Sequence, residues 1–103
     1  MTVPDTERLE AQFHQDMLEL LVREHEVGLN SARFRQMVEE HGGANTAHRL
    51  LKPDRELPPT FKYLREIGRT DLAMESHVLK DKYKPLFSDQ EREIASWRLM
   101  SGD

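Results

Sequence analysis

Residues 61–79 read FKYLREIGRTDLAMESHVL, and the fold of the chain depends on how this stretch is interpreted. Apolar residues recur at helical spacing on both sides of Gly68, so we expect one helix over residues 61–67 and another over residues 71–79. Because the GRT turn between them is short, the two helices must cross. On the second helix, Glu75 stands in the middle of the apolar face.

A carboxylate on a buried helix face needs a partner, because an unpaired buried charge is strongly destabilising. Arg69 in the turn and Arg65 one helical turn before it are the basic residues that can fold back onto this face. We therefore predict that Glu75 is mostly buried, in a structural ion pair with Arg69 or Arg65 or bonded to backbone amides at the start of its helix. The alternative, a general acid or base, needs a second titratable group in the same place, and His77 points to another face.

The rest of the chain is also dominated by helix signals, with capping residues at the starts and glycine or proline at the ends. Ser88 and Glu91 have the spacing of a capping box at the start of the last helix. We expect one long helix over residues 5–27 and shorter helices over residues 31–41, 44–51 and 89–100.

The segments between these helices carry turn and loop signals. KPDRELPPT, residues 52–60, holds three prolines and is predicted to be the linker of the chain. DKYKPLF, residues 81–87, is expected to be a loop whose aromatic side chains plug the core. Gly42 and Gly43 lack the pattern of a phosphate-binding loop and are predicted to form a tight corner between helices.

These patterns predict an all-α fold in which five or six short helices pack around one long N-terminal helix. A chain of 103 residues forms a single helical domain, residues 1–103, with one modest core. Hydrophobic residues make up 37% of the chain and recur periodically, which excludes a disordered protein. The absence of cysteine excludes disulfides, and no apolar run is long enough to span a membrane. We expect a cytoplasmic protein.

The run from about Asn30 to Leu99 resembles a small all-helical module found in uncharacterised bacterial proteins. The module has the pattern F-x-x-L-x-E-x-G-R-x-D-L-x-x-E-x-x-V-L, and the resemblance covers about two thirds of this chain. The matching residues are Phe61, Leu64, Glu66, Gly68, Arg69, Asp71, Leu72, Glu75, Val78 and Leu79. The resemblance implies a bacterial all-α protein, and it implies no activity, cofactor or functional residue.

The sequence contains no recognisable pattern for catalysis or metal binding. The five histidines form no i, i+4 pair on a helix, and there is no cysteine to join them. No motif places a histidine base beside any of the serines. We therefore expect no metal, no cofactor and no enzymatic activity.

Residues 33–69 hold eight basic and five acidic residues, although the whole chain has a net charge of −4. Residues 31–52 have the outline of a helix-turn-helix. A candidate nucleic-acid patch on this pair of helices consists of Arg33, Arg35, His48, Arg49 and Lys52. Because an acidic chain gains little non-specific attraction to DNA, nucleic-acid binding is the alternative function rather than the first choice.

The long N-terminal helix carries more apolar surface than the short helices can easily cover. In MLELLV, residues 17–22, Glu19 is the only polar residue. A stripe including Leu18 and Val22 is therefore predicted to stay open for another protein or for a second copy of the chain. The alternative is that this helix is the central strut of the bundle. The best-fitting function is a non-catalytic protein–protein interaction module, as an adaptor or a regulatory subunit.

Overall fold

The computed structural model describes residues 5–53 and 59–100, and all regular secondary structure in these two ranges is helical. The helices are α1 (Asp5–Glu26), α2 (Ala32–His41), α3 (Gly43–Leu50), α4 (Pro59–Glu66), α5 (Met74–Val78) and α6 (Asp89–Met100), with short 3₁₀ helices η1 (Thr70–Leu72) and η2 (Asp81–Leu86). The predicted all-α fold with one long N-terminal helix is confirmed. None of the helices in the two described ranges is both long and apolar enough to cross a membrane.

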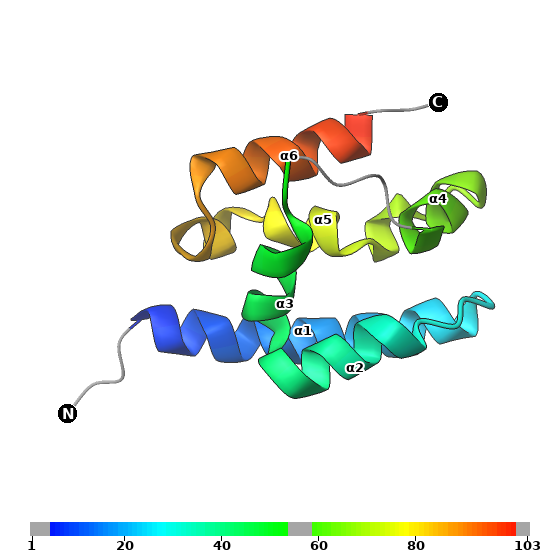
Figure 1. The fold of residues 1–103 in the computed structure, drawn as a ribbon, viewed down its shortest axis with the longest axis horizontal. Helices are drawn as coiled ribbons and strands as arrows, with labels where there is room; N and C mark the ends of the chain where they lie inside the picture. The colour runs from blue at the N-terminus through cyan, green and yellow to red at the C-terminus, as the bar shows by residue number, and fades with distance from the viewer. Residues whose placement is uncertain (1–4, 54–58, 101–103) are drawn as a thin grey trace.

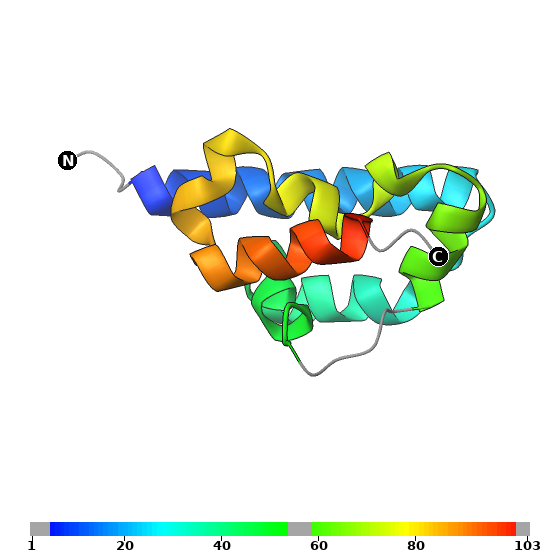
Figure 2. The same cartoon turned by 90° about the horizontal axis from the view of Figure 1, so that it is seen from above.

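The helices form two layers that α3 connects (Figure 1). One layer holds α1 and α2 side by side, and the other holds α4, α5 and α6. Seen from above, α6 projects between α1 and α2 (Figure 2). Since α5 contacts both α1 and α6, it lies at the centre of the arrangement.

The core beneath α1 is mostly apolar and is centred on Phe13 and Met17, which are fully buried. Phe13 makes edge-on contacts with Tyr83 and Phe87, each at a ring-centroid distance of 5.1 Å. Such pairs stabilise a core beyond the area that they bury. The predicted aromatic plug of residues 81–87 is confirmed, although most of this segment is the 3₁₀ helix η2 rather than an irregular loop.

Gly42 and Gly43 form the predicted tight corner and bring α3 against α1. Gly42 has a φ of 84°, a backbone conformation that glycine adopts without strain. A Cβ atom on Gly43 would lie 2.8 Å from the Cα of His14, so only glycine fits at this helix crossing. The Nδ1 of His14 accepts a hydrogen bond of 3.0 Å from the backbone N–H of Gly43, which satisfies one of the unpaired donors at the start of α3.

The predicted helix over residues 71–79 is wrong in its first part. The chain forms η1, then an extended Ala73 with ψ of 146°, and only then α5. Ser76 stabilises the broken form, because its hydroxyl donates a hydrogen bond of 2.7 Å to the carbonyl of Thr70. A serine side chain that bonds a nearby backbone carbonyl competes with regular helix.

The capping box at the start of α6 is confirmed, since the backbone N–H of Ser88 donates to Glu91 Oε1 and that of Glu91 donates to Ser88 Oγ. The predicted linker over residues 52–60 falls mainly on residues 54–58, which lie outside the described residues. The linker prediction is wrong at residues 59–60, because α4 already begins at Pro59. Proline is favourable in the first turn of a helix, where its missing N–H would have no intrahelical partner.

Candidate binding cleft and buried charge cluster

Glu75 lies on the inward side of α5 and is 3% exposed, so its predicted burial is confirmed. Its Oε2 accepts a hydrogen bond of 3.0 Å from Nη1 of Arg98 on α6. Arg98 is itself 1% exposed, and its Nη2 donates at 2.8 Å to the carbonyl of Leu50, the last residue of α3. A single guanidinium thus joins α6 to α5 and to the negative end of the α3 dipole.

The predicted partners of Glu75 are wrong. Arg69 lies on the surface, where its Nε and Nη2 donate to the carboxylate of Asp71 at 3.1 and 3.2 Å. Arg65 is half-buried on α4, and the ion pair that the structure shows for Glu75 is with Arg98 instead. The expected fold-back of an arginine from the turn assumed a continuous second helix, and the break at η1 and Ala73 removes that geometry.

Glu24 of α1 is a second buried carboxylate, which the sequence analysis did not single out. It is 4% exposed and accepts a hydrogen bond of 2.7 Å from the hydroxyl of Ser31. Burial raises the pKa of Glu24 to about 7; the bond from Ser31 opposes this rise, and the negative charge of Glu75 adds to it. Ser31 precedes α2 as predicted, but its side chain bonds Glu24 and makes no capping bond to α2.

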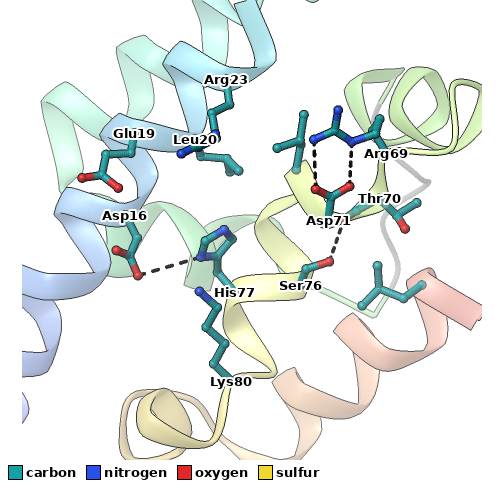
Figure 3. A pocket seen from close by; sticks show the side chains of 12 residues that line it. Asp16, Glu19, Leu20, Arg23, Arg69, Thr70, Asp71, Ser76, His77 and Lys80 are labelled. Carbon is teal, nitrogen blue, oxygen red and sulfur yellow. Dashed lines mark hydrogen bonds and ion pairs between the residues drawn. The ribbon is translucent and has the colours of Figure 1, made fainter. Parts of the chain in front are cut away.

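An open cleft of about 660 Å³ lies between α1 and the segment from η1 to Lys80 (Figure 3). Leu20 from α1, Leu72 from η1 and Leu99 from α6 form its apolar base. Binding sites in proteins typically enclose about 300–1,000 Å³, so this cleft is large enough to hold several side chains of a ligand.

Charged side chains of both signs surround this apolar base (Figure 3). Arg69 and Asp71 on the rim form an ion pair with each other, and the hydrogen bond from Arg69 lowers the pKa of Asp71. The charged residues that line the cleft are Asp16, Glu19 and Arg23 on α1 and Arg69, Asp71 and Lys80 on the opposite wall. The cleft therefore offers an apolar contact together with both positive and negative groups.

His77 lies on the cleft wall and faces Asp16 (Figure 3). Its Nδ1 is 3.8 Å from Asp16 Oδ2, too far for a hydrogen bond, and has no hydrogen-bond partner among the described residues. Burial lowers the pKa of His77, the charge of Lys80 lowers it further, and Asp16 opposes the change. The shift favours the neutral ring. Asp16 is held in place by the hydroxyl of Tyr83, which donates to the same carboxylate oxygen.

The predicted interface stripe on α1 is only partly exposed. Val22 is 60% exposed, whereas Leu18 is half-buried and packs against the core. The open part of the stripe is therefore a single side chain, and an interface at this position stays a prediction.

The candidate nucleic-acid patch is divided by the packing of α3. His48 is directed to α6, with its Nδ1 2.5 Å from Oε2 of Glu91. The other members of the patch, Arg33, Arg35, Arg49 and Lys52, are exposed. Since much of α3 is buried, Asn45 and Arg49 are its exposed residues. Nucleic-acid binding by this pair of helices stays a prediction.

Among residues 5–53 and 59–100, no group of three or more histidine, cysteine, aspartate or glutamate residues is arranged to hold a metal ion. Comparison of the chain with known protein families, with curated proteins and with solved structures finds no match. The cleft and the exposed surfaces are therefore the basis for a proposed function.

Proposed function

We propose that the chain is a non-catalytic protein–protein interaction module that binds a segment of a partner protein in the cleft between α1 and the η1–α5 segment. The observation that supports this proposal is the combination of a leucine base with a rim of both charge signs. Protein interfaces commonly place an apolar anchor at the centre and polar groups around it. An adaptor or a regulatory subunit requires such a binding surface and requires no catalytic residues.

The lining of the cleft defines the chemistry of the bound segment. An apolar side chain would contact Leu20, Leu72 and Leu99, and polar neighbours of both signs would face the rim.

Selection from a library of short displayed peptides tests this proposal, with the purified chain as bait. Thr70 lines the cleft and is half-buried, so Thr70→Trp places a large ring in the cleft and keeps the backbone carbonyl that Ser76 uses. The matched control is Glu39→Trp, which places the same ring on the exposed side of α2. Circular dichroism melting checks that both variants are folded.

We expect the selected peptides to bind the wild-type chain and Glu39→Trp with equal affinity. The dissociation constant for Thr70→Trp should rise at least about tenfold, the equivalent of about 1.4 kcal/mol. Equal binding to all three proteins would place the peptides elsewhere on the surface, and a selection without any enriched peptide would also contradict the proposal.

A further inference from the structure

The last helix, α6, has an unusual distribution of side chains. Its inward side is mixed, since the fully buried Arg98 and the half-buried Glu91 and Arg92 lie beside the apolar residues Ala95, Ile94 and Leu99, which pack in or against the core. Two of its large apolar residues nevertheless face outward, with Trp97 62% exposed and Met100 79% exposed. These two side chains are three residues apart and therefore lie next to each other on the helix.

The charges of α6 are also divided between its two sides. Both arginines of the helix are used inward, since Arg98 donates to Glu75 and to the Leu50 carbonyl, and Arg92 donates to the Leu79 carbonyl at 3.1 Å. The exposed charged residues of α6 are both acidic, Asp89 and Glu93. The outer face of α6, defined as Asp89, Glu93, Trp97 and Met100, is therefore apolar and negatively charged.

We infer that the outer face of α6 binds a basic amphipathic helix of a partner protein. The apolar stripe of that helix would cover Trp97 and Met100, and its lysine or arginine residues would pair with Glu93 and Asp89. Hydrophobic anchors give such helix-to-helix contacts their affinity, and complementary charges select the partner. The partner helix should be basic, because an acidic helix would bring like charges together on this face.

The same charges argue against other occupants. A two-fold contact of α6 with a second copy of itself would leave Asp89 and Glu93 without a basic partner, since the outer face of α6 carries no lysine or arginine. An anionic membrane or a nucleic acid would be repelled by the same two carboxylates. The surface is also distinct from the cleft, since Leu99, which lines the cleft, lies on a different side of α6 from Trp97 and Met100.

Two designed helical peptides of equal length test this inference. Both carry one stripe of leucines and no tryptophan, and they differ only in having lysine or glutamate beside the stripe. Trp97 is the one tryptophan of the chain, so its emission reports directly on the proposed surface. We expect the lysine peptide to shift the emission to shorter wavelength and to bind at least about tenfold more tightly than the glutamate peptide. Added salt should weaken this binding.

Charge-reversal variants identify the residues that are responsible. Glu93→Lys should reverse the preference between the two peptides, whereas Glu39→Lys, the same change on the exposed side of α2, should leave it intact. Thr70→Phe, which fills the cleft and adds no second tryptophan, should also leave it intact, so a failure here is distinct from a failure of the cleft proposal. Equal binding of the two peptides, an unchanged preference in Glu93→Lys, or the absence of any emission shift would each overturn the inference.

Discussion

The interior beneath α1 is the apolar core around Phe13, and the junction beneath α6 is the contact that Arg98 makes with α5 and α3. These two regions are held together by different forces. Beneath α1, Phe13 packs edge-on against Tyr83 and Phe87, and the contact depends on apolar burial. Beneath α6, Arg98 bonds Glu75 and the carbonyl of Leu50, so the contact depends on charges and on hydrogen-bond geometry.

This difference determines how each region responds to substitution. An apolar contact loses free energy in proportion to the atoms removed and the cavity left behind. A buried ion pair behaves otherwise, because removing one partner leaves the other charge buried without compensation. Loss of one residue of the pair should therefore be severe, and loss of both should be mild.

The largest expected effect is that of Arg98→Met, which leaves Glu75 buried without its ion-pair partner. We expect the free energy of unfolding to fall by about 3–5 kcal/mol, measured by urea denaturation followed by circular dichroism. The double variant Glu75→Leu with Arg98→Met should recover most of this loss. If the double variant is as unstable as the single one, the junction beneath α6 depends on packing and the comparison fails.

A parallel pair of variants in the α1 region should show the opposite pattern. Phe13→Ala is expected to cost about 3–5 kcal/mol through the cavity that it leaves. Adding Tyr83→Ala should lower the stability further, since a second cavity-forming change cannot restore the lost contact. Recovery in this double variant would contradict the apolar description of the region.

The sequence predicted the parts of the molecule that depend on local or periodic signals. The long helix α1, the capping box of Ser88 and Glu91, and the inward aromatic residues of 81–87 all follow from such signals. The partner of Glu75 could not be predicted in this way, because Arg98 lies 23 residues further along the chain and reaches it only through the way that α6 crosses α5. The sequence offers one indication that Arg98 is buried, because it stands three residues after Ala95 and therefore lies on the same side of α6.

The cleft and Glu24 were missed for a related reason. The cleft combines side chains of α1, the η1–α5 segment and α6, and no periodicity within one helix reports on three elements at once. The burial of Glu24 depends on the path of the chain between α1 and α2, which brings Ser31 back to its carboxylate. Both features are products of tertiary structure.

The next largest effect should be the pH dependence introduced by Glu24. Its pKa rises from 4.5 to about 7 on folding, so the folded state holds this proton more tightly than the unfolded chain does. The contribution of Glu24 to stability is therefore fully present below pH 4.5 and is lost as the pH rises through 7. The loss is about 3 kcal/mol, since each pH unit corresponds to about 1.36 kcal/mol.

Glu24→Gln should abolish this loss, because glutamine stays neutral and can still accept the bond from Ser31. We expect the variant and the wild type to be equally stable near pH 4.5 and the variant to be more stable above pH 7, in urea titrations at a series of pH values. Glu26→Gln is the matched control, since Glu26 is exposed on the same helix. An identical pH profile for the wild type and Glu24→Gln would show that ionisation of Glu24 does not lower the stability of the folded state.

A smaller effect is expected for Gly43→Ala at the crossing of α1 and α3. Alanine favours helix by up to about 1 kcal/mol, but its Cβ would lie 2.8 Å from the backbone of His14. Overpacking of this kind typically costs about 1–3 kcal/mol, so we expect a net loss of stability in thermal unfolding. Asn45→Ala, on the exposed side of α3, should change little. A Gly43→Ala variant as stable as Asn45→Ala would mean that α3 can move away from α1 without loss.

The smallest effect on folding should come from Val22→Glu, because Val22 is 60% exposed and substitutions at such positions usually change stability by less than about 0.5 kcal/mol. Leu18→Glu should destabilise the chain more, since Leu18 packs against the core. This contrast distinguishes the predicted open stripe from the alternative, in which α1 is the central strut of the bundle. If the stripe joins two copies of the chain, light scattering should show a dimer for the wild type and for the control Gln12→Glu, an exposed position on another side of α1, and a folded monomer for Val22→Glu. A wild-type chain that stays monomeric at high concentration would leave Leu18 as part of the core and Val22 as an isolated apolar residue on the surface, of the kind that monomeric proteins commonly tolerate.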